Sequence, residues 1–190
     1  VRGQFVGYRD EPGVAADSEV ETFAAVRLHI DNWRWAGVPF YIRTGKRLPL
    51  TCTEVRVELE APPCSVFGED FASPGRSNYV RFRLGPDVAI ALGVRPKLPG
   101  EAMIGQEVEL LATRGGGDVL DAYVRLLHDA MKGDATLFAR EDTVEAEWRV
   151  IEPLAKSTTP LHSYAPGSWG PSAADRLTAD VGGWARPKGG

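Results

Sequence analysis

Apolar and polar residues alternate along several short segments of the first two thirds of the chain. The alternation is strict over 53–60, where Val55, Val57 and Leu59 occupy one face and charged residues the other. A period of two residues is typical of a β-strand, and one face of this strand is expected to meet water or a partner. The same reasoning predicts about six strands, over residues 22–30, 38–43, 53–60, 79–84, 88–94 and 107–113.

The pattern becomes helical in the last third. Apolar residues recur at three- and four-residue spacing over 120–131, and Gly133 follows where a helix C-terminus favours glycine. A second helix is predicted to begin with a capping box formed by Asp142 and Glu145 and to end before a proline. A third, short helix is predicted over 172–181, directly after a Gly-Pro pair.

Strands come first and helices follow, without the strand–helix alternation that builds a parallel sheet. This order predicts an α+β fold, with a large, mainly antiparallel sheet and helices packed on one face. Residues 1–20 show no period and are rich in Gly, Pro and Asp, so an extended or looping entry segment is predicted there. The length of 190 residues makes a single domain over 1–190 the default.

Composition narrows the possible functions. A formal net charge of −4 argues against nucleic-acid binding, which requires a basic surface. Apolar runs are too short for a membrane span, and the first residues do not resemble a signal peptide, so a cytoplasmic location is predicted. Cys52, Cys64 and the three histidines lack metal-ligand spacing, so reduced thiols and no metal are expected.

The segment 31–49 combines tryptophans, an apolar run and a basic cluster more tightly than any other. Its apolar members are predicted to build core and sheet: Trp33, Trp35, Val38, Phe40 and Ile42. Motif searches find no complete active site: the glycines at 115–117 lack the dinucleotide pattern, and 44–47 lacks the rest of a P-loop.

Five long segments resemble the C-terminal domain of the glucose-6-phosphate dehydrogenase family. They are RGQFVGY (2–8), ETFAAVRLHIDNWRWAGVPFYIRTGKRLP (21–49), DAYVRLLHDAMKGDATLFAR (121–140), VEAEWRVIEPL (144–154) and YAPGSWGP (164–171). They occur in the order of the family and cover nearly the whole chain.

The resemblance implies a two-domain enzyme that oxidises glucose 6-phosphate at C1 to 6-phosphogluconolactone. An N-terminal Rossmann domain of such enzymes binds NADP, and a histidine is the general base. The C-terminal α+β domain closes the substrate site and forms a homodimer. The coenzyme fingerprint and the base belong to a segment outside this sequence, so no catalytic or NADP-binding residue is expected here, and the isolated chain is expected to be inactive.

Carried over residue by residue, the family's phosphate-binding lysine falls on Lys46. Without the resemblance, a solvated lysine is the simpler interpretation. A second basic residue of the family is replaced by Thr51, which can still donate one hydrogen bond, and a sugar-contacting glutamine is replaced by Gly85. Arg47 is the nearest substitute cation, whereas Arg43 is expected to anchor backbone or a neighbouring carboxylate.

The resemblance also bears on a second NADP site and on assembly. Some eukaryotic relatives hold a structural NADP on the sheet; Arg56 and Arg83 fall at similar positions, but Cys52 and Gly93 replace basic members, so this site is not predicted. A homodimer through the sheet is expected from the pairable charges of the 53–60 strand. Two alternatives remain open: a non-catalytic assembly or regulatory relative, and a free-standing phosphosugar-binding module.

Overall fold

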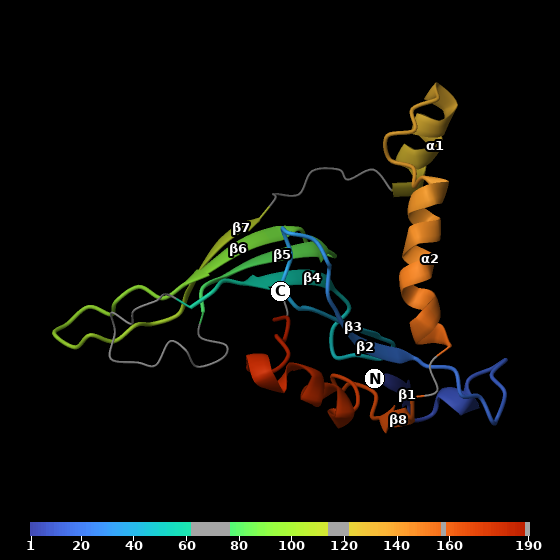
Figure 1. The fold of residues 1–190 in the computed structure, drawn as a ribbon, viewed down its shortest axis with the longest axis horizontal. Coiled ribbons are helices and arrows are strands. Elements are labelled where there is room, and N and C mark those ends of the chain that lie inside the picture. The colour runs from blue at the N-terminus through green and yellow to red at the C-terminus, as the bar shows by residue number, and fades with distance from the viewer. Residues whose placement is uncertain (62–76, 114–121, 157–158, 189–190) are drawn as a thin grey trace. The chain divides into compact units, whose positions relative to one another are not determined.

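The computed structural model describes residues 1–61, 77–113, 122–156 and 159–188 (Figure 1). They belong to two compact units, one made of Val1–Arg114 and Pro160–Gly190 and the other of Gly115–Thr159. All of the described strands lie in the first unit, and both described α-helices lie in the second. The fold class is therefore α+β, as predicted.

The first unit contains a four-stranded sheet in the order β3-β2-β1-β8. Its strands are β1 (Arg2–Phe5), β2 (Phe23–Leu28), β3 (Phe40–Gly45) and β8 (Leu161–Tyr164). β1 pairs antiparallel with β2 and parallel with β8, while β2 pairs antiparallel with β3. The extended or looping entry segment predicted over 1–20 contains β1. Its strand pairing was not predicted, because a four-residue strand is too short to show a period and its partners are distant in sequence.

A second four-stranded sheet runs in chain order and is entirely antiparallel. Its strands are β4 (Thr53–Glu58), β5 (Tyr79–Gly85), β6 (Ala89–Val94) and β7 (Val108–Thr113). The prediction of one large sheet is corrected to two, since residues 46–52 carry the chain from β3 to β4 without pairing those strands. Alternation shows which residues share a face, but it does not show where a sheet ends.

The core of the first sheet is built around Phe23, which is 2% exposed. The buried apolar residues around it are Phe5, Ala25, Tyr164 and Ala174. Ala174 belongs to η2 (Ser172–Val181), a 3₁₀ helix at the position of the third predicted helix, and a shorter one, η1 (Tyr8–Asp10), follows β1. A Cβ atom at Gly170 would lie 2.2 Å from the Phe23 ring, so glycine is required where this turn meets the core.

The tryptophan-rich turn before β3 does not join this core. Trp33 is 93% exposed, and Trp35, Val38 and Ile42 are also exposed. Phe40 is half-buried and packs edge-to-face against Trp35, with ring centroids 5.4 Å apart. Phe40 and Ile42 lie in the sheet, as predicted. The prediction that these residues also build the core is wrong for most of them, because apolar character alone does not say which face of a segment is covered.

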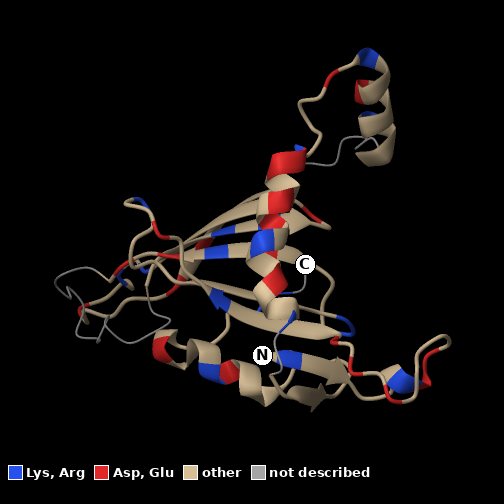
Figure 2. Ribbon diagram, turned by 45° about the vertical axis from the view of Figure 1, so that its right-hand side comes forward, with Lys and Arg blue, Asp and Glu red and all other residues tan. Residues whose placement is uncertain are grey.

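The second unit contains α1 (Ala122–Lys132) and α2 (Glu141–Ala155). Gly133 ends α1 in a left-handed conformation, as predicted. The predicted capping box is wrong: Arg140 is the N-cap residue, and Asp142 lies in the first turn, where it accepts hydrogen bonds from the Arg140 guanidinium. α2 also continues through Pro153. Acidic residues are spread along this helix, with one arginine among them (Figure 2).

Neither described helix has the length and apolar character that a membrane span requires.

Candidate functional site

Lys46 directly follows the last residue of β3, at the start of the segment that joins the two sheets. Its side chain is exposed, and within the described residues its ammonium group has no hydrogen-bond or ion-pair partner. A compact cation without a protein partner is available to an anionic ligand as a point charge.

The backbone that carries Lys46 is held firmly. The Lys46 amide donates to the Thr22 carbonyl at 2.8 Å, and the Tyr164 hydroxyl donates to the Lys46 carbonyl at 2.8 Å. Gly45 allows this close approach, because a Cβ atom there would lie 2.9 Å from the Phe23 ring. Packing against Phe23 therefore explains the glycine at position 45, and no phosphate-binding loop is needed to account for it.

Thr51 and Gly85 lie near the start of the second sheet. Thr51 is exposed and has no side-chain partner in the described part of the chain. Gly85 is paired with Thr53 across β4 and β5, and nothing lies within 4 Å of a Cβ atom built on it. Among the described residues no hydrogen bond joins Thr51 to Lys46, so both side chains are open but do not contact each other.

Arg47, the nearest substitute cation, is engaged elsewhere. Its guanidinium lies 3.1 Å from the Glu11 carboxylate and over the Phe5 ring, 5.8 Å from the centroid. Its carbonyl accepts a hydrogen bond from the Gly167 amide at 2.7 Å, and its φ is 54°, in the left-handed region. Its side chain is therefore not free to replace the second cation.

Arg43 anchors backbone, as predicted. It lies between two tryptophan rings, 4.7 Å from the Trp169 centroid and 4.9 Å from that of Trp184, and donates to the Ala185 carbonyl at 3.2 Å. Burial lowers the pKa of Arg43, an effect that nearby Asp175 partly offsets. The arginine thus ties β3 to the C-terminal segment.

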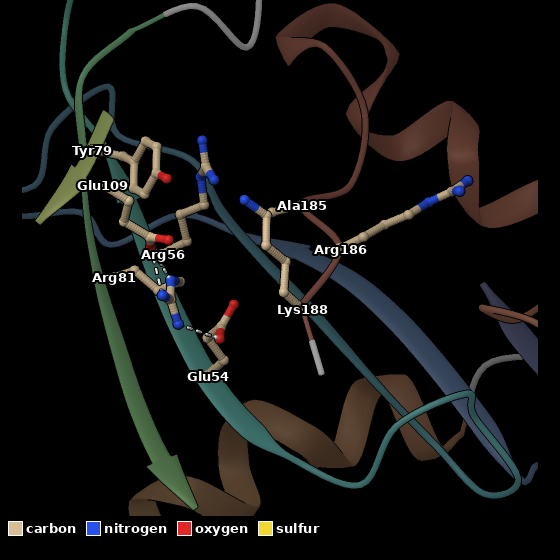
Figure 3. Close-up of a pocket in the computed structure, with 8 residues that line it drawn as sticks. All are labelled: Glu54, Arg56, Tyr79, Arg81, Glu109, Ala185, Arg186 and Lys188. Carbon is tan, nitrogen blue, oxygen red and sulfur yellow. Dashed lines mark hydrogen bonds and ion pairs between the residues drawn. The ribbon is translucent and has the colours of Figure 1, made fainter. Parts of the chain in front are cut away.

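The second sheet carries a cluster of charged residues on one face (Figure 3). The Glu54 carboxylate lies 3.2 Å from the Arg81 guanidinium and 3.1 Å from that of Arg83, and Arg81 also binds Glu109. Burial alone would lower the pKa of Arg81, but its hydrogen bonds to Glu109 and Glu54 raise it overall. Glu54, Glu109, Arg81 and Arg83 thus pair with one another, whereas Arg186 and Lys188 of the C-terminal segment add two further positive charges to the cluster.

The two arginines that resemble members of a structural NADP site have partners within the chain. Arg56 lies over the Tyr79 ring, 3.5 Å from its centroid, and binds Glu58 at 2.5 Å. Arg83 binds Glu54 and donates to the carbonyl of Lys188. Gly93 lies against the Tyr79 ring, which would be 2.1 Å from an added Cβ atom. Among the described residues, no group of three metal-ligating side chains is found.

Cys52 is a free thiol, whereas Cys64 and the glycines at 115–117 lie outside the described residues. Sequence reasoning missed Tyr164, whose hydroxyl meets residues 118 and 142 positions away. No local sequence pattern predicts a contact between residues so far apart in the chain. The string that contains this tyrosine is part of the family resemblance, which was the one available signal.

Known proteins match the chain over nearly its full length. The family model described as "Glucose-6-phosphate dehydrogenase, C-terminal domain" matches residues 1–185. The glucose-6-phosphate 1-dehydrogenase of Aggregatibacter actinomycetemcomitans is 44% identical over 197 residues, a match that covers 100% of this chain and 39% of that protein. Glucose-6-phosphate 1-dehydrogenase 1 of Mycobacterium tuberculosis is 40% identical, with 98% of this chain and 40% of that protein covered.

Solved structures agree with these matches. The crystal structure of glucose-6-phosphate 1-dehydrogenase from Mycobacterium avium superposes with a TM-score of 0.86 at 40% identity, covering 99% of this chain and 40% of that chain. A glucose-6-phosphate dehydrogenase in complex with its substrate glucose-6-phosphate has a TM-score of 0.78 at 29% identity, covering 98% of this chain and 40% of that chain. The chain thus spans about two fifths of the length of these relatives.

Proposed function

Because the chain belongs to the glucose-6-phosphate dehydrogenase family and matches its C-terminal domain, we propose that residues 1–190 form the substrate-closing and dimer-forming domain of an NADP-dependent glucose-6-phosphate 1-dehydrogenase. The full protein oxidises glucose 6-phosphate to 6-phosphogluconolactone and transfers the hydride to NADP, which residues outside this chain bind. The match over residues 1–185 is the observation that carries this proposal.

Lys46 binds the substrate phosphate in this proposal. Its exposed ammonium group, free of protein partners in the described residues, supports the role, and so does the fixed backbone beneath it. An ammonium-to-phosphate contact is a charge-assisted hydrogen bond, roughly twice as strong as a neutral one. Thr51 supplies one further neutral hydrogen bond, and Gly85 supplies no side-chain contact.

Replacing Lys46 with alanine tests the proposal. If the phosphate is bound equally in the ground state and the transition state, KM for glucose 6-phosphate should rise by about 10- to 100-fold while kcat stays nearly constant. Steady-state kinetics of the full-length protein at saturating NADP measure this change. Lys132→Ala, which removes an exposed lysine of α1, is the matched control and should leave KM unchanged. An unchanged KM in Lys46→Ala would remove the phosphate role.

The homodimer contact is assigned, within the same proposal, to the apolar face of the second sheet. The charged face was the expected contact, but the arginines that its strands carry there, Arg56, Arg81 and Arg83, are paired with carboxylates of the same chain. On the opposite face the strand register aligns two rows of apolar residues across all four strands: Val55–Phe82–Ile90–Ala112 and Val57–Val80–Leu92–Leu110. Most of these side chains are exposed, and a contiguous exposed apolar surface marks an interaction site.

A non-catalytic relative is the second candidate, because Thr51 and Gly85 depart from the family's substrate contacts. The two functions differ in one direct assay. If the full-length protein reduces NADP when glucose 6-phosphate is added, it is a dehydrogenase. If it does not reduce NADP but binds an active dehydrogenase and changes the activity of that enzyme, it is a non-catalytic relative.

A further inference from the structure

We propose that the Tyr164 hydroxyl is a positioning group for Lys46, holding the main chain so that the lysine ammonium is presented to the substrate phosphate. The inference rests on the phosphate role proposed above for Lys46 and adds a second residue to that site. Tyr164 touches no substrate in this account and acts only through the lysine backbone.

The hydroxyl of Tyr164 is placed by a rigid, buried ring. The residue is 4% exposed, and its ring packs against those of Phe23 and Phe5, with centroids 5.6 and 6.4 Å away. Tyr164 ends β8 and Lys46 follows β3, and these strands are the two edges of the first sheet. The contact between them therefore spans the two strands in between.

The donors and acceptors around Tyr164 determine which group accepts its single phenolic proton. The Tyr164 oxygen lies 2.8 Å from the Lys46 carbonyl, 3.1 Å from the Thr22 carbonyl and 3.0 Å from the Thr22 hydroxyl. The Thr22 hydroxyl already accepts from the Phe5 amide at 3.0 Å, so its own proton is available to the Tyr164 oxygen. The tyrosine proton is then left for the two carbonyls, of which Lys46 is the nearer.

The protonation state of Tyr164 supports this arrangement. Burial raises the pKa of the phenol above its ordinary value of 10.0, and the hydrogen bond with Thr22 offsets part of that rise. The group therefore keeps its proton at neutral pH and remains a donor to the main chain.

Two further contacts fix the same stretch of backbone. The Lys46 amide donates to the Thr22 carbonyl, and the Arg47 carbonyl accepts from the Gly167 amide in the turn that follows β8. Arg47 holds a φ of 54°, which a non-glycine residue adopts only where its surroundings impose it. The main chain on both sides of the Lys46 Cα atom is thus fixed while its side chain is free, as a preorganised ligand contact requires.

Tyr164→Phe in the full-length protein isolates the hydroxyl, because phenylalanine keeps the ring packing. We expect KM for glucose 6-phosphate to rise by about 3- to 10-fold, the value of one hydrogen bond, with kcat nearly unchanged. Tyr79→Phe is the matched control. That tyrosine is also buried, and its hydroxyl donates to Glu107, which directly precedes β7, so its loss should leave KM unchanged.

A double-mutant cycle separates positioning from a general structural effect. If Tyr164 acts through Lys46, Tyr164→Phe adds no further rise in KM once Lys46 is alanine. The same rise in both backgrounds would overturn the inference. If Lys46→Ala raises KM but Tyr164→Phe does not, the inference alone fails; if Lys46→Ala itself leaves KM unchanged, the proposed phosphate role fails.

Gly167→Ala tests the same backbone if Tyr164→Phe does not fold. Gly167 has a φ of 79° and no atom within 4 Å of an added Cβ, so the substitution introduces conformational strain without a clash. KM should rise, because the strained turn holds the Arg47 carbonyl. Gly133→Ala, with a φ of 72° and equally open space, is the control in the other unit. An unchanged KM in Gly167→Ala would contradict the inference.

Discussion

Replacing Glu54 with alanine is expected to lower the free energy of unfolding by about 3 to 5 kcal/mol, the cost of breaking a buried ion pair. The Glu54 side chain is 7% exposed and binds both Arg81 and Arg83, which are 13% and 10% exposed. Among the described residues, its removal leaves Arg83 without a carboxylate partner and leaves Arg81 with Glu109 alone. Urea unfolding of the full-length protein measures the loss as a lower transition midpoint.

Glu58→Ala is the matched control for this change. Glu58 lies on the same strand and pairs with Arg56, but its side chain is 45% exposed. An exposed ion pair contributes about 0 to 1 kcal/mol, so the unfolding midpoint should scarcely move. Equal losses in the two variants would show that the Glu54 cluster does not stabilise the second sheet.

Replacing Leu110 with arginine is expected to convert the proposed dimer into monomers. Leu110 is 58% exposed and faces Leu92 on the apolar side of the second sheet. In a two-fold symmetric interface each substitution occurs twice, and an unpaired guanidinium placed there costs several kcal/mol per copy. Sedimentation of the full-length protein should then give half the mass of the unsubstituted form.

Leu111→Arg provides the comparison, because Leu111 is equally exposed at 57% but pairs with Ala91 on the opposite face of the sheet. This variant should remain a dimer. A dimer that persists in Leu110→Arg would contradict the assignment. A lower melting temperature without dissociation would show that the apolar face is covered within one protomer.

Alternation predicted the strands of the second sheet well, because residues that alternation places on one face also share a face in the observed sheet. The rows that begin at Val55 and Val57 continue across β5, β6 and β7 without a change of face. Alternation did not show which face is covered. The charged side was interpreted as the one to meet water or a partner, yet Glu54 and Arg83 are buried while Val55 is exposed.

Long-range pairing accounts for what was missed in the first sheet. β1 and β8 are four-residue strands whose partners lie far away in the chain, so neither has a local signature. Nothing in the local sequence indicated that the position of Phe23 requires glycine at 45 and 170. The prediction of a capping box at Asp142 was wrong because α2 begins earlier, with Arg140 as its N-cap residue.

The candidate site was predicted in part. Lys46 was identified from the family resemblance, since a lysine at a strand end has no distinctive pattern of its own. The structure adds that its ammonium lacks a partner within the described residues, while the neighbouring Arg47 is paired with Glu11. The role of the Tyr164 hydroxyl could not be predicted from the sequence, because its contact with Lys46 forms only when β8 and β3 belong to one sheet.

The most direct test of the account compares two substrates that differ only in the phosphate. We expect Lys46→Ala to lower kcat/KM for glucose 6-phosphate by about 10- to 100-fold and to leave kcat/KM for unphosphorylated glucose within about twofold of the unsubstituted protein. An equal fall for both substrates would contradict the claim that Lys46 binds the phosphate.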